Sequence, residues 1–550
     1  MKKLALVLAV VMVLSLGLTA CGGSTSSTGT ASSAPAGSSS SGSASDAAPA
    51  YNPDALQVKA LDDNTLQVTL TARTPYFLEL TAFPAYAPVQ QATVEANGEA
   101  WAVDAATYIG NGPYKIAEWV PSSHITMVKN ENYWNVDSLA GPDTLQFTLM
   151  EDDAAQLTAF QSGELDFIDA VPNDEIDALS STPEFYKEGQ IGTYYVSYNT
   201  QAAPFDDPLV RQAFTLAVDR DYICKQIGKS GQIPAGAFVS EGLPTITYLY
   251  NEGTAHQQIG EALQQMWGQL GATVTLESQE WATFLNTRKN GDYQVARNGW
   301  LGDYNDPISF LDMWITGGGN NDAQWSNAEF DSLIKQIKSS GDAEARMEMM
   351  HQAEDIIFDE WMLCPIYYYV DIYMAQQNLE NLSTSPLGFK FFMNASNGTD
   401  TLKVCTGPDP DTIDPALNSA VDGGTMIDHA FEGLYTVAYG TTPTPGQAES
   451  VEISEDGLTY TFHLREGLKW SDGTPLTAHD FVYSWQRAVD PATGADYAYM
   501  FECIAGYTEA INGEEYVAPA ADASSASTSE SAAESVSAST SESASTSAAA

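Results

Sequence analysis

The sequence predicts a mixed α/β protein built from more than one domain. Its 550 residues are too many for a single hydrophobic core. Its 44% hydrophobic and 11% aromatic residues are typical of globular proteins. Segments with helical periodicity are followed by segments with strand character, as at His256–Leu270 and the TVTLE run at 273–277. This helix-then-strand order predicts α/β lobes.

The first predicted element is a β-hairpin at Leu56–Leu70. Apolar and polar residues alternate along LQVKALDDNTLQVTL, and residues 62–64 supply the turn. In the middle of the chain, the helix predicted at His256–Leu270 collects its large apolar side chains on one face. It ends before Gly271, a residue type that favours helix ends.

Two more elements are predicted near the end of the chain. Val451–Leu464 alternates around an Asp-Gly turn and predicts a second hairpin. A helix then begins after Thr477, which is a good N-cap, and runs to Arg487. Asp480 stands at the third helical position, so the pair forms a variant of the capping box.

The charge balance excludes one class of partner. The chain has 22 basic and 72 acidic residues, a formal net charge of −50. Such an excess disfavours nucleic acid, or any anionic surface, as a direct partner.

No catalytic, metal or cofactor motif is recognisable. The six histidines are scattered, and GxSxG, HExxH and Walker A patterns are absent from the sequence. The cysteines beyond Cys21 lack CxxC or metal-ligand spacing, and their pairing stays open. Cys224 lies in a helical stretch and is expected to be a buried free thiol. We therefore expect neither an enzyme nor a bound cofactor.

The N-terminal residues predict export. Lys2 and Lys3 precede an apolar stretch, and the run ends in LTAC at Cys21. LTAC resembles a bacterial lipobox, which implies a diacylated Cys21 and a lipid-anchored protein on the extracytoplasmic face of the membrane, as on a Gram-positive cell surface. The alternative is an ordinary signal peptide with an incidental cysteine. Residues 21–50 and 518–550 are rich in Ser, Gly and Ala and predict flexible tails.

Two long segments carry a family resemblance. After Thr401 come LKVCTGPDPDTIDPALNSAVDGGTMIDHAFEGL and VEISEDGLTYTFHLREGLKWSDGTPLTAHDFVYSWQRAVDP. They resemble the N-terminal part of the oligopeptide-binding lipoproteins of ABC importers (bacterial extracellular solute-binding protein family 5). Residues 56–395, from LQVKALDDNTLQVTL to SPLGFKFFMNA, resemble the remainder. The resemblance implies a two-lobed periplasmic-binding-protein-like fold of type II, with an extra subdomain in lobe I, in circularly permuted order.

The resemblance also implies the domain boundaries. They are a signal peptide at 1–20, a Ser/Gly tether at 21–50, a subsidiary subdomain of lobe I at 51–88 plus 446–517, lobe I at 89–192 plus 371–445, lobe II at 193–370, and a tail at 518–550.

The permuted order requires a joint and a new opening. Asn394–Asp400, NASNGTD, would join the family's usual ends, and the chain would open between Glu514 and Pro53. Gly231–Asn251 joins two motifs that the family separates by an amphipathic helix and loop. We therefore expect a deletion there that exposes apolar surface of lobe II.

The most specific motif for function is Trp281–Leu311, WATFLNTRKNGDYQVARNGWLGDYNDPISFL. It closely resembles the ligand-cleft motif of the family. Peptides with different side chains share an α-ammonium, an α-carboxylate and backbone amides. Asp303 matches the family residue that pairs with the ammonium. The alternative is that Asp303 merely forms a turn before Asp306-Pro307, which itself has the character of turn chemistry.

Basic side chains are expected at the other end of the ligand. Arg288, Arg297 and His256 match family positions that receive the peptide C-terminus, and a planar guanidinium suits a carboxylate. The alternative for the arginines is local ion pairing with acidic neighbours. For His256, near the start of a predicted helix, a structural role is the alternative.

Aromatic positions are expected to line the side-chain pockets. The residues concerned are Trp281, Trp300 and Tyr497, with Tyr304 beside Asp303 also counted among the ligand contacts. Flat rings bury varied side chains without demanding a particular hydrogen bond, although such aromatics are often core residues. Two acids that contact peptide in well-known members are replaced here by Ser419 and Ser197.

The sequence thus predicts a monomeric, lipid-anchored protein that captures oligopeptides by hinge closure. It would deliver them to an ABC permease driven by separate ATPase subunits. The alternatives are a peptide-pheromone receptor, a binder of another small solute such as nickel, haem or an oligosaccharide, and a non-functional recombined gene product.

Overall fold

The computed structural model describes residues 50–234, 245–437 and 442–518. All of them belong to one compact unit, Pro49–Ala550. Cys21, the predicted leader and nearly all of both predicted tails lie outside the described residues. Part of the Gly231–Asn251 segment, where a deletion is predicted, also lies outside them, because residues 235–244 are not described. Within the described ranges, every helix is too short or too polar to cross a membrane.

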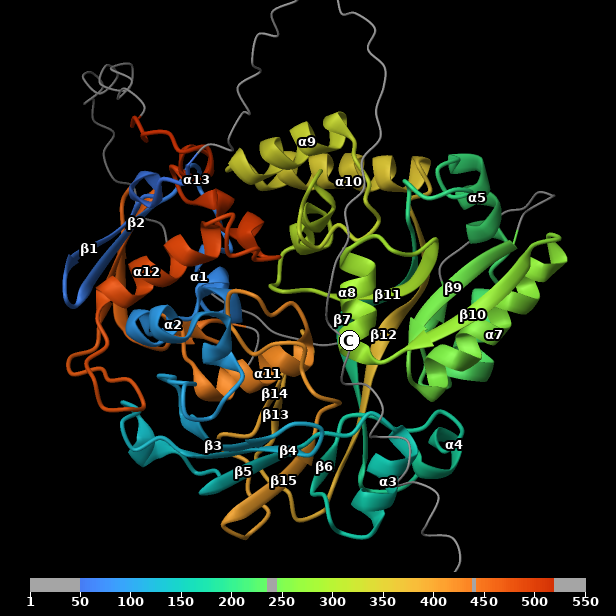
Figure 1. Cartoon of the computed structure of the whole chain (residues 1–550), viewed down its shortest axis with the longest axis horizontal. Coiled ribbons are helices and arrows are strands. Elements are labelled where there is room, and N and C mark those ends of the chain that lie inside the picture. The colour runs from blue at the N-terminus through green and yellow to red at the C-terminus, as the bar shows by residue number, and fades with distance from the viewer. Residues whose placement is uncertain (1–49, 235–244, 438–441, 519–550) are drawn as a thin grey trace, which may run out of the picture. The chain divides into compact units, whose positions relative to one another are not determined.

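One large mixed sheet dominates the described part of the chain (Figure 1). Its strands, in spatial order, are β10 (Thr273–Gln279), β9 (Thr245–Asn251), β11 (Val295–Leu301), β7 (Phe185–Tyr198), β12 (Leu363–Ala375), β6 (Phe167–Ile168), β15 (Thr401–Cys405), β5 (Thr144–Thr148), β4 (His124–Lys129) and β3 (Tyr114–Val120). The short β8 (Ile233–Pro234) also pairs with β12.

The long strands β7 and β12 hold the two halves of this sheet together. They form an antiparallel ladder with register shifts between Pro365 and Tyr367 and between Tyr368 and Val370. One end of β7 also pairs with β11, whereas the far end of β12 pairs with β6. The β7–β12 ladder therefore joins the half of the sheet that contains β9–β11 to the half that contains β3–β6.

A second sheet of four strands has the order β1 (Val58–Asp62), β2 (Thr65–Thr69), β19 (Thr459–Leu464) and β18 (Ala448–Ile453). Two further pairs are short: β13 (Ser383–Thr384) with β14 (Lys390–Phe391), and β16 (Tyr435–Thr436) with β17 (Thr444–Pro445).

Helices pack on both sheets (Figure 1). The α-helices of the described residues are α1 (Phe77–Leu80), α2 (Gln91–Asn97), α3 (Asp153–Gln161), α4 (Ile176–Leu179), α5 (Pro208–Leu216), α6 (Arg220–Tyr222), α7 (Thr254–Gln269), α8 (Trp281–Lys289), α9 (Ala328–Ser339), α10 (Ala343–Asp359), α11 (Val421–Ala430), α12 (Ala478–Val489) and α13 (Tyr507–Ile511). α7 covers β9 and β10, and α12 covers β1 and β2.

The local predictions are confirmed. The predicted hairpins are β1–β2 and β18–β19, and the helix predicted at His256–Leu270 is α7, followed by strand β10. Thr477 and Asp480 form the capping box of α12. Cys224, Cys364, Cys405 and Cys503 are free and buried, which confirms the free thiol expected at Cys224.

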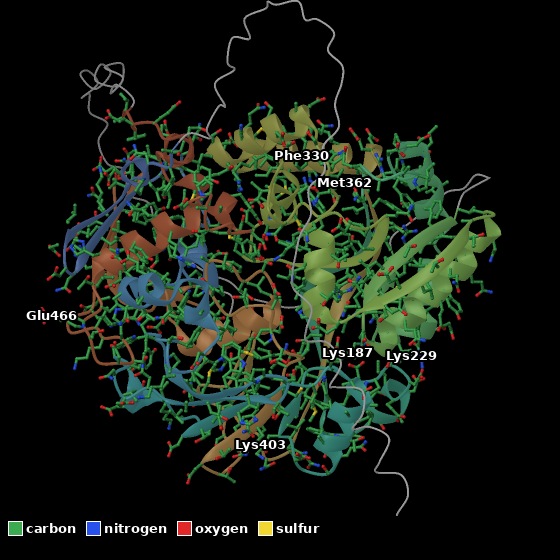
Figure 2. All side chains as sticks on the ribbon, in the orientation of Figure 1. Lys187, Lys229, Phe330, Met362, Lys403 and Glu466 are labelled. Atoms are coloured by element: carbon green, nitrogen blue, oxygen red, sulfur yellow. The ribbon has the colours of Figure 1, made fainter. Side chains whose placement is uncertain are left out.

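The interior contains more than one hydrophobic core. The larger core joins residues from both ends of the described chain and includes Phe330 and Met362, which are labelled in Figure 2. A second core lies between α7, β7, β9 and β12 and includes Tyr198, Phe214 and Trp267. Burial of these large side chains is the main favourable contribution to folding.

Segments far apart in the sequence complete each other's sheets. β15 lies between β5 and β6 and runs parallel to both. β19 lies between β2 and β18. At the ends of the described chain, the Asn52 amide donates to the Ala510 carbonyl (2.9 Å), and Asn52 Nδ2 donates to the Glu514 carbonyl (2.6 Å). The two ends of the described chain therefore lie side by side.

The segment Asn394–Asp400 is tied to its surroundings. Ser396 and Glu380 exchange two backbone hydrogen bonds of 2.9 Å. The Asp400 carbonyl accepts a hydrogen bond from the Thr144 amide (3.0 Å) just before β15 begins. The backbone groups of Ser396 and Asp400 in this connection are therefore hydrogen-bonded to neighbouring segments.

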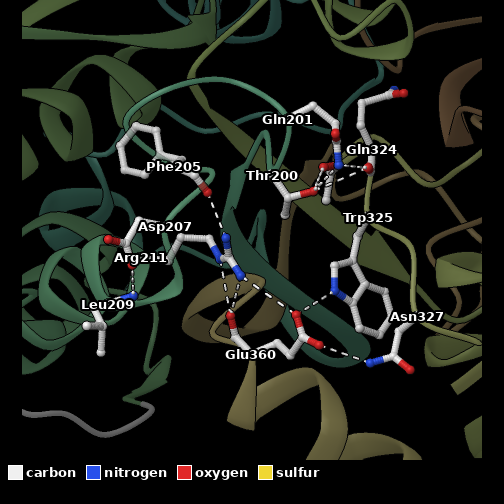
Figure 3. A network of polar contacts seen from close by, with 11 residues as sticks. Thr200, Gln201, Phe205, Asp207, Leu209, Arg211, Gln324, Trp325, Asn327 and Glu360 are labelled. Atoms are coloured by element: carbon white, nitrogen blue, oxygen red, sulfur yellow. Dashed lines mark hydrogen bonds and ion pairs between the residues drawn. The ribbon is translucent and has the colours of Figure 1, made fainter. Parts of the chain in front are cut away.

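A buried arginine fixes α5 to the end of α10 (Figure 3). Arg211 is only 3% exposed; it donates to the Glu360 carbonyl (2.8 and 3.1 Å) and to the Phe205 carbonyl (2.7 Å). Its guanidinium is 3.8 Å from the Glu360 carboxylate. That carboxylate also accepts hydrogen bonds from Trp325 Nε1 (3.2 Å) and Asn327 Nδ2 (2.9 Å).

We expect Arg211→Met to lower the free energy of unfolding by about 2–4 kcal/mol, because it leaves the carbonyls of Phe205 and Glu360 without their donor and removes the cation beside the Glu360 carboxylate. Urea unfolding measures this. The matched control is Lys225→Met, whose partner Asp221 is 2.9 Å away and whose side chain is 64% exposed. It should cost less than about 1 kcal/mol. Equal losses for the two variants would contradict the role of the buried network.

Candidate functional site

The principal cavity has a volume of about 300 Å³ and lies between α8, β11 and the segments around Phe389 and Ser419. α8 begins at Trp281 because the Glu280 carboxylate caps it, accepting from the amides of Ala282 (3.0 Å) and Thr283 (3.1 Å). Phe83 and Tyr497, which come from opposite ends of the chain, close another side of the cavity.

Asp303 lies in the wall of this cavity, just after β11. The Tyr497 hydroxyl donates to Asp303 Oδ1 (2.9 Å), and the Ser309 hydroxyl donates to Oδ2 (3.3 Å). The Asp303 amide in turn donates to Ser309 Oγ (2.9 Å). The carboxylate is thus fixed in place, and no Lys or Arg of the described chain pairs with it.

The environment of Asp303 disfavours its charge. Burial raises the pKa of Asp303 well above its usual value, and the nearby Asp312 raises it further. The hydrogen bonds from Tyr497 and Ser309 act in the opposite direction but do not outweigh burial. A cation that entered the cavity would favour the ionised form.

Arg297, on β11, is a guanidinium without an anion. Its Nη2 donates to the Tyr369 hydroxyl (3.3 Å), and its guanidinium carbon is 5.2 Å from the Tyr194 ring centroid and 5.9 Å from that of Trp281. Its Nε is buried with no hydrogen-bond partner among the described residues. Within those residues it has no carboxylate partner either.

The other basic residues of the cavity are already paired. Arg288 Nη2 is 3.4 Å from Asp322 Oδ2, and Nη1 donates to Asn298. Lys289 Nζ is 2.6 Å from Asp496 Oδ2. Arg288 therefore forms the local ion pair that was the alternative to a role in ligand binding. It also lines the cavity.

The predicted aromatic residues are brought together. Trp281, Trp300 and Tyr497 all line the cavity. The Trp300 indole donates to the Ser309 carbonyl (2.7 Å), which fixes the ring beside Tyr497 at a centroid distance of 6.3 Å. Phe83 packs edge-on against Tyr497 at 5.0 Å. The apolar walls therefore surround the fixed carboxylate of Asp303.

Tyr304 does not line the principal cavity. It is 3% exposed and stacks on Tyr76 with a centroid distance of 4.7 Å, and it lines a small separate cavity together with Asp303, so its predicted contact with the ligand stays a prediction. It packs in the core because the chain turns away after Asp303. Asp306 has the turn role that the sequence predicts: its Oδ1 accepts from the Ile308 amide (3.1 Å), and it pairs with Arg346.

A second cavity of about 410 Å³ adjoins the first and shares Trp281, Arg297, Tyr369 and Asp422 with it. His256, at the first turn of α7, lines the second cavity. Its Nδ1 is 3.3 Å from the Tyr194 hydroxyl, and burial together with Arg297 lowers its pKa well below the usual value. His256 is therefore neutral at pH 7.

The two serines have separate environments. Ser419 lines the principal cavity and donates to Asp496 Oδ2 (3.0 Å). Ser197 is buried on β7, with its hydroxyl 3.1 Å from that of Tyr293, and it lies outside both cavities.

Sequence reasoning missed several wall residues, among them Tyr369, Phe389 and Asp422. Each belongs to a segment that is remote in sequence from the Trp281–Leu311 motif. A local sequence pattern does not show where such a residue lies in the folded protein. The run of Tyr, Ile and Val residues in β12 marks Tyr369 as a strand residue. Only the pairing of that strand brings it to the cavity.

Comparisons with known proteins agree with this geometry. The model of the bacterial extracellular solute-binding proteins, family 5 (middle), matches residues 27–248, 241–322 and 442–540. The oligopeptide-binding protein OppA of Bacillus subtilis is 34% identical over 387 residues, 62% of this chain and 71% of the relative. The dipeptide-binding protein DppE of the same organism is also 34% identical, over 61% of this chain and 69% of the relative.

Solved structures are similar as well. The Haemophilus influenzae OppA complex with RPPGFSPFR matches with a TM-score of 0.55 at 28% identity, over 59% of this chain and 71% of that one. The Escherichia coli murein tripeptide binding protein MppA matches with a TM-score of 0.57 at 28% identity, over 64% and 74%. The mixed α/β fold is thus the two-lobed fold of these binding proteins.

Asp303→Asn should stabilise the ligand-free protein at neutral pH. The raised pKa of Asp303 means that its contribution to stability is fully present below the unfolded pKa and is lost as pH rises through the folded pKa. Asn does not titrate, so the difference in unfolding midpoint between variant and parent should grow from acidic to neutral pH. Thermal unfolding between pH 4 and 8 measures it. A difference that is independent of pH would contradict the buried, cation-free carboxylate.

Proposed function

This chain belongs to the bacterial extracellular solute-binding proteins of family 5, and from that premise we propose that it binds oligopeptides for an ABC importer. One observation carries the proposal. Among the described residues, the principal cavity combines a carboxylate without a cation, Asp303, and a guanidinium without an anion, Arg297.

These two groups complement the parts that all peptides share. The α-ammonium would donate to Asp303, and the α-carboxylate of a peptide of suitable length would accept from Arg297 through charge-assisted hydrogen bonds. Arg288 and Lys289 are neutralised by Asp322 and Asp496, so they contribute less free charge. The aromatic walls would accept varied side chains.

Capture would proceed by closure of the two lobes. The β7–β12 ladder connects the two halves of the large sheet and is the natural hinge. A peptide that contacts both lobes favours the closed form by its differential affinity, and the closed form would be delivered to a permease with separate ATPase subunits. The protein would act as a monomer, held outside the cytoplasm by lipid on Cys21, and would catalyse no reaction.

We also propose that the chain is a circular permutant with the boundaries given above. The support is that β15 lies between the early strands β5 and β6, and that β19 joins the late strand β18 to the early strand β2. The ends of the described chain also meet at Asn52 and Glu514. Lobe II at 193–370 would then begin and end within the β7–β12 ladder.

Calorimetry with tri- to hexapeptides tests the binding. Asp303→Ala should weaken binding by at least about tenfold, because the ammonium loses its carboxylate. N-acetylated peptides are the matched control: acetylation should weaken binding to the parent protein but add little to the loss in Asp303→Ala. Additive losses would contradict the pairing. Failure of the parent protein to bind any peptide would refute the proposed function.

A reordered chain tests the permutation. Joining Tyr516 to Tyr51 and opening the chain at Gly398 restores the family's order while keeping the residues that pack on the larger core at both ends of the described chain. We expect its unfolding free energy to change by no more than about 2 kcal/mol and its peptide affinity to stay the same. Denaturant unfolding and calorimetry measure both. A reordered chain that aggregates while the present chain folds would contradict the permutation.

A further inference from the structure

We propose that the second cavity is a subsite for a cationic side chain of the bound peptide. The protein would then prefer peptides with lysine or arginine in the half away from the N-terminus. This inference rests on the proposed function, since it assumes that a peptide is held in the principal cavity. The second cavity has a volume of about 410 Å³, and the proposed binding of the two peptide termini assigns no ligand group to it.

Acceptor oxygens line this cavity without donors. Those that are buried and lack a hydrogen-bond partner among the described residues are Glu151 Oε1, Gln156 Oε1, Asn251 Oδ1, Thr406 Oγ1 and Asp422 Oδ2. A buried acceptor without a donor is costly, and native structures contain few of them. Their presence in the wall of one cavity indicates a ligand that brings several hydrogen-bond donors.

Two of these residues are built into the protein rather than placed loosely on its surface. Gln156 is 2% exposed and Asn251 is 9% exposed. The Gln156 amide nitrogen donates to the Met150 carbonyl (2.9 Å), and the Asn251 amide nitrogen donates to the Glu252 carbonyl (3.1 Å). These bonds fix both amides so that each oxygen stays unpaired. Each therefore presents a lone pair to a donor in the cavity.

Most of the charged side chains in the lining of the cavity are acidic. The carboxylates in its lining belong to Glu151, Asp153, Asp169, Glu252 and Asp422. Arg297 is the one Lys or Arg side chain in that lining, and His256 is neutral. Burial, together with Glu252 and Glu280, raises the pKa of Glu151, as expected in a negative potential.

The lysines around the cavity offset only part of this charge. Lys390 is 3.2 Å from Asp169 and 3.1 Å from Asp371 and is 2% exposed, so it compensates Asp169 but not the other carboxylates in the lining. Lys229 donates to the Asn173 carbonyl (3.4 Å) and lies near Asp174 and Asp177. The space therefore keeps a net negative charge.

The arrangement fits a side chain better than a metal ion. Within the described residues, no group of three or more acidic, His or Cys side chains is close enough to hold a metal. The acceptors are instead spread along the cavity, where Tyr367, Tyr369 and Trp281 offer apolar surface. A lysine or arginine side chain has both parts that this wall requires: an apolar stem and a head that only donates.

The test is a positional scan by calorimetry at about 0.15 M salt. The probes are pentaalanine, five pentaalanine variants with lysine at one position each, and the same five with norleucine, which keeps the stem without the charge. We expect lysine to bind about tenfold tighter than norleucine at one or two positions in the C-terminal half, and not at the first position.

The variant Glu151→Gln removes one charge from the second cavity without changing the shape of the side chain. We expect it to reduce the lysine preference by at least about threefold. Glu466→Gln makes the same change at an exposed position far along the chain (Figure 2) and should leave the preference intact.

The outcomes separate the two proposals. Equal affinity for lysine and norleucine at every position, with pentaalanine still bound, would overturn the cationic subsite and leave the proposed function standing. Tight binding of spermidine alone, undiminished by bound pentaalanine, would overturn it as well, because the cavity would then serve a free polyamine. If no peptide binds, including pentaalanine, the proposed function fails and this inference fails with it.

Discussion

The antiparallel ladder between β7 and β12 is the interaction on which the rest of the structure depends. It carries the large sheet from the β9–β11 half to the β3–β6 half, so the two cores are linked through its hydrogen bonds. The walls of both cavities are attached to these halves: Arg297 lies on β11, which pairs with β7, and Tyr369 lies on β12 itself. Any change in the bend of this ladder would alter the distance between the walls, which is what a hinge requires.

Charge compensation divides the cavity residues into two groups. Arg288 with Asp322 and Lys289 with Asp496 are ion pairs that attach α8, a wall of the principal cavity, to neighbouring segments. Asp303, Arg297 and the acceptors of the second cavity have no such partners among the described residues. Desolvated groups left unpaired are costly to the free protein, and a ligand that supplies the missing partner recovers this cost. Under the proposed function, the groups that the protein leaves unpaired would determine which ligand it prefers.

The order of the segments along the chain matters less than their pairing in space. β15 lies between the early strands β5 and β6, β19 joins β18 to the early strand β2, and Asn52 meets Glu514 at the ends of the described chain. A sheet position is specified by hydrophobic faces and neighbouring strands, and a connecting loop contributes little to it. For this reason a permuted order is compatible with one packed structure.

The sequence by itself determined the local elements and identified several residues that line the principal cavity. Alternation and capping identified β1–β2, β18–β19, α7 and α12, because these signals depend on neighbouring residues. The Trp281–Leu311 motif identified Asp303, Arg297 and Trp300, which lie within a few residues of one another. Only the tertiary structure decided that Arg288 is paired, that Tyr304 packs in the core, and that Tyr369 and Asp422 face the cavities. Those outcomes depend on contacts between residues distant in the chain, and a local pattern contains no information about such contacts.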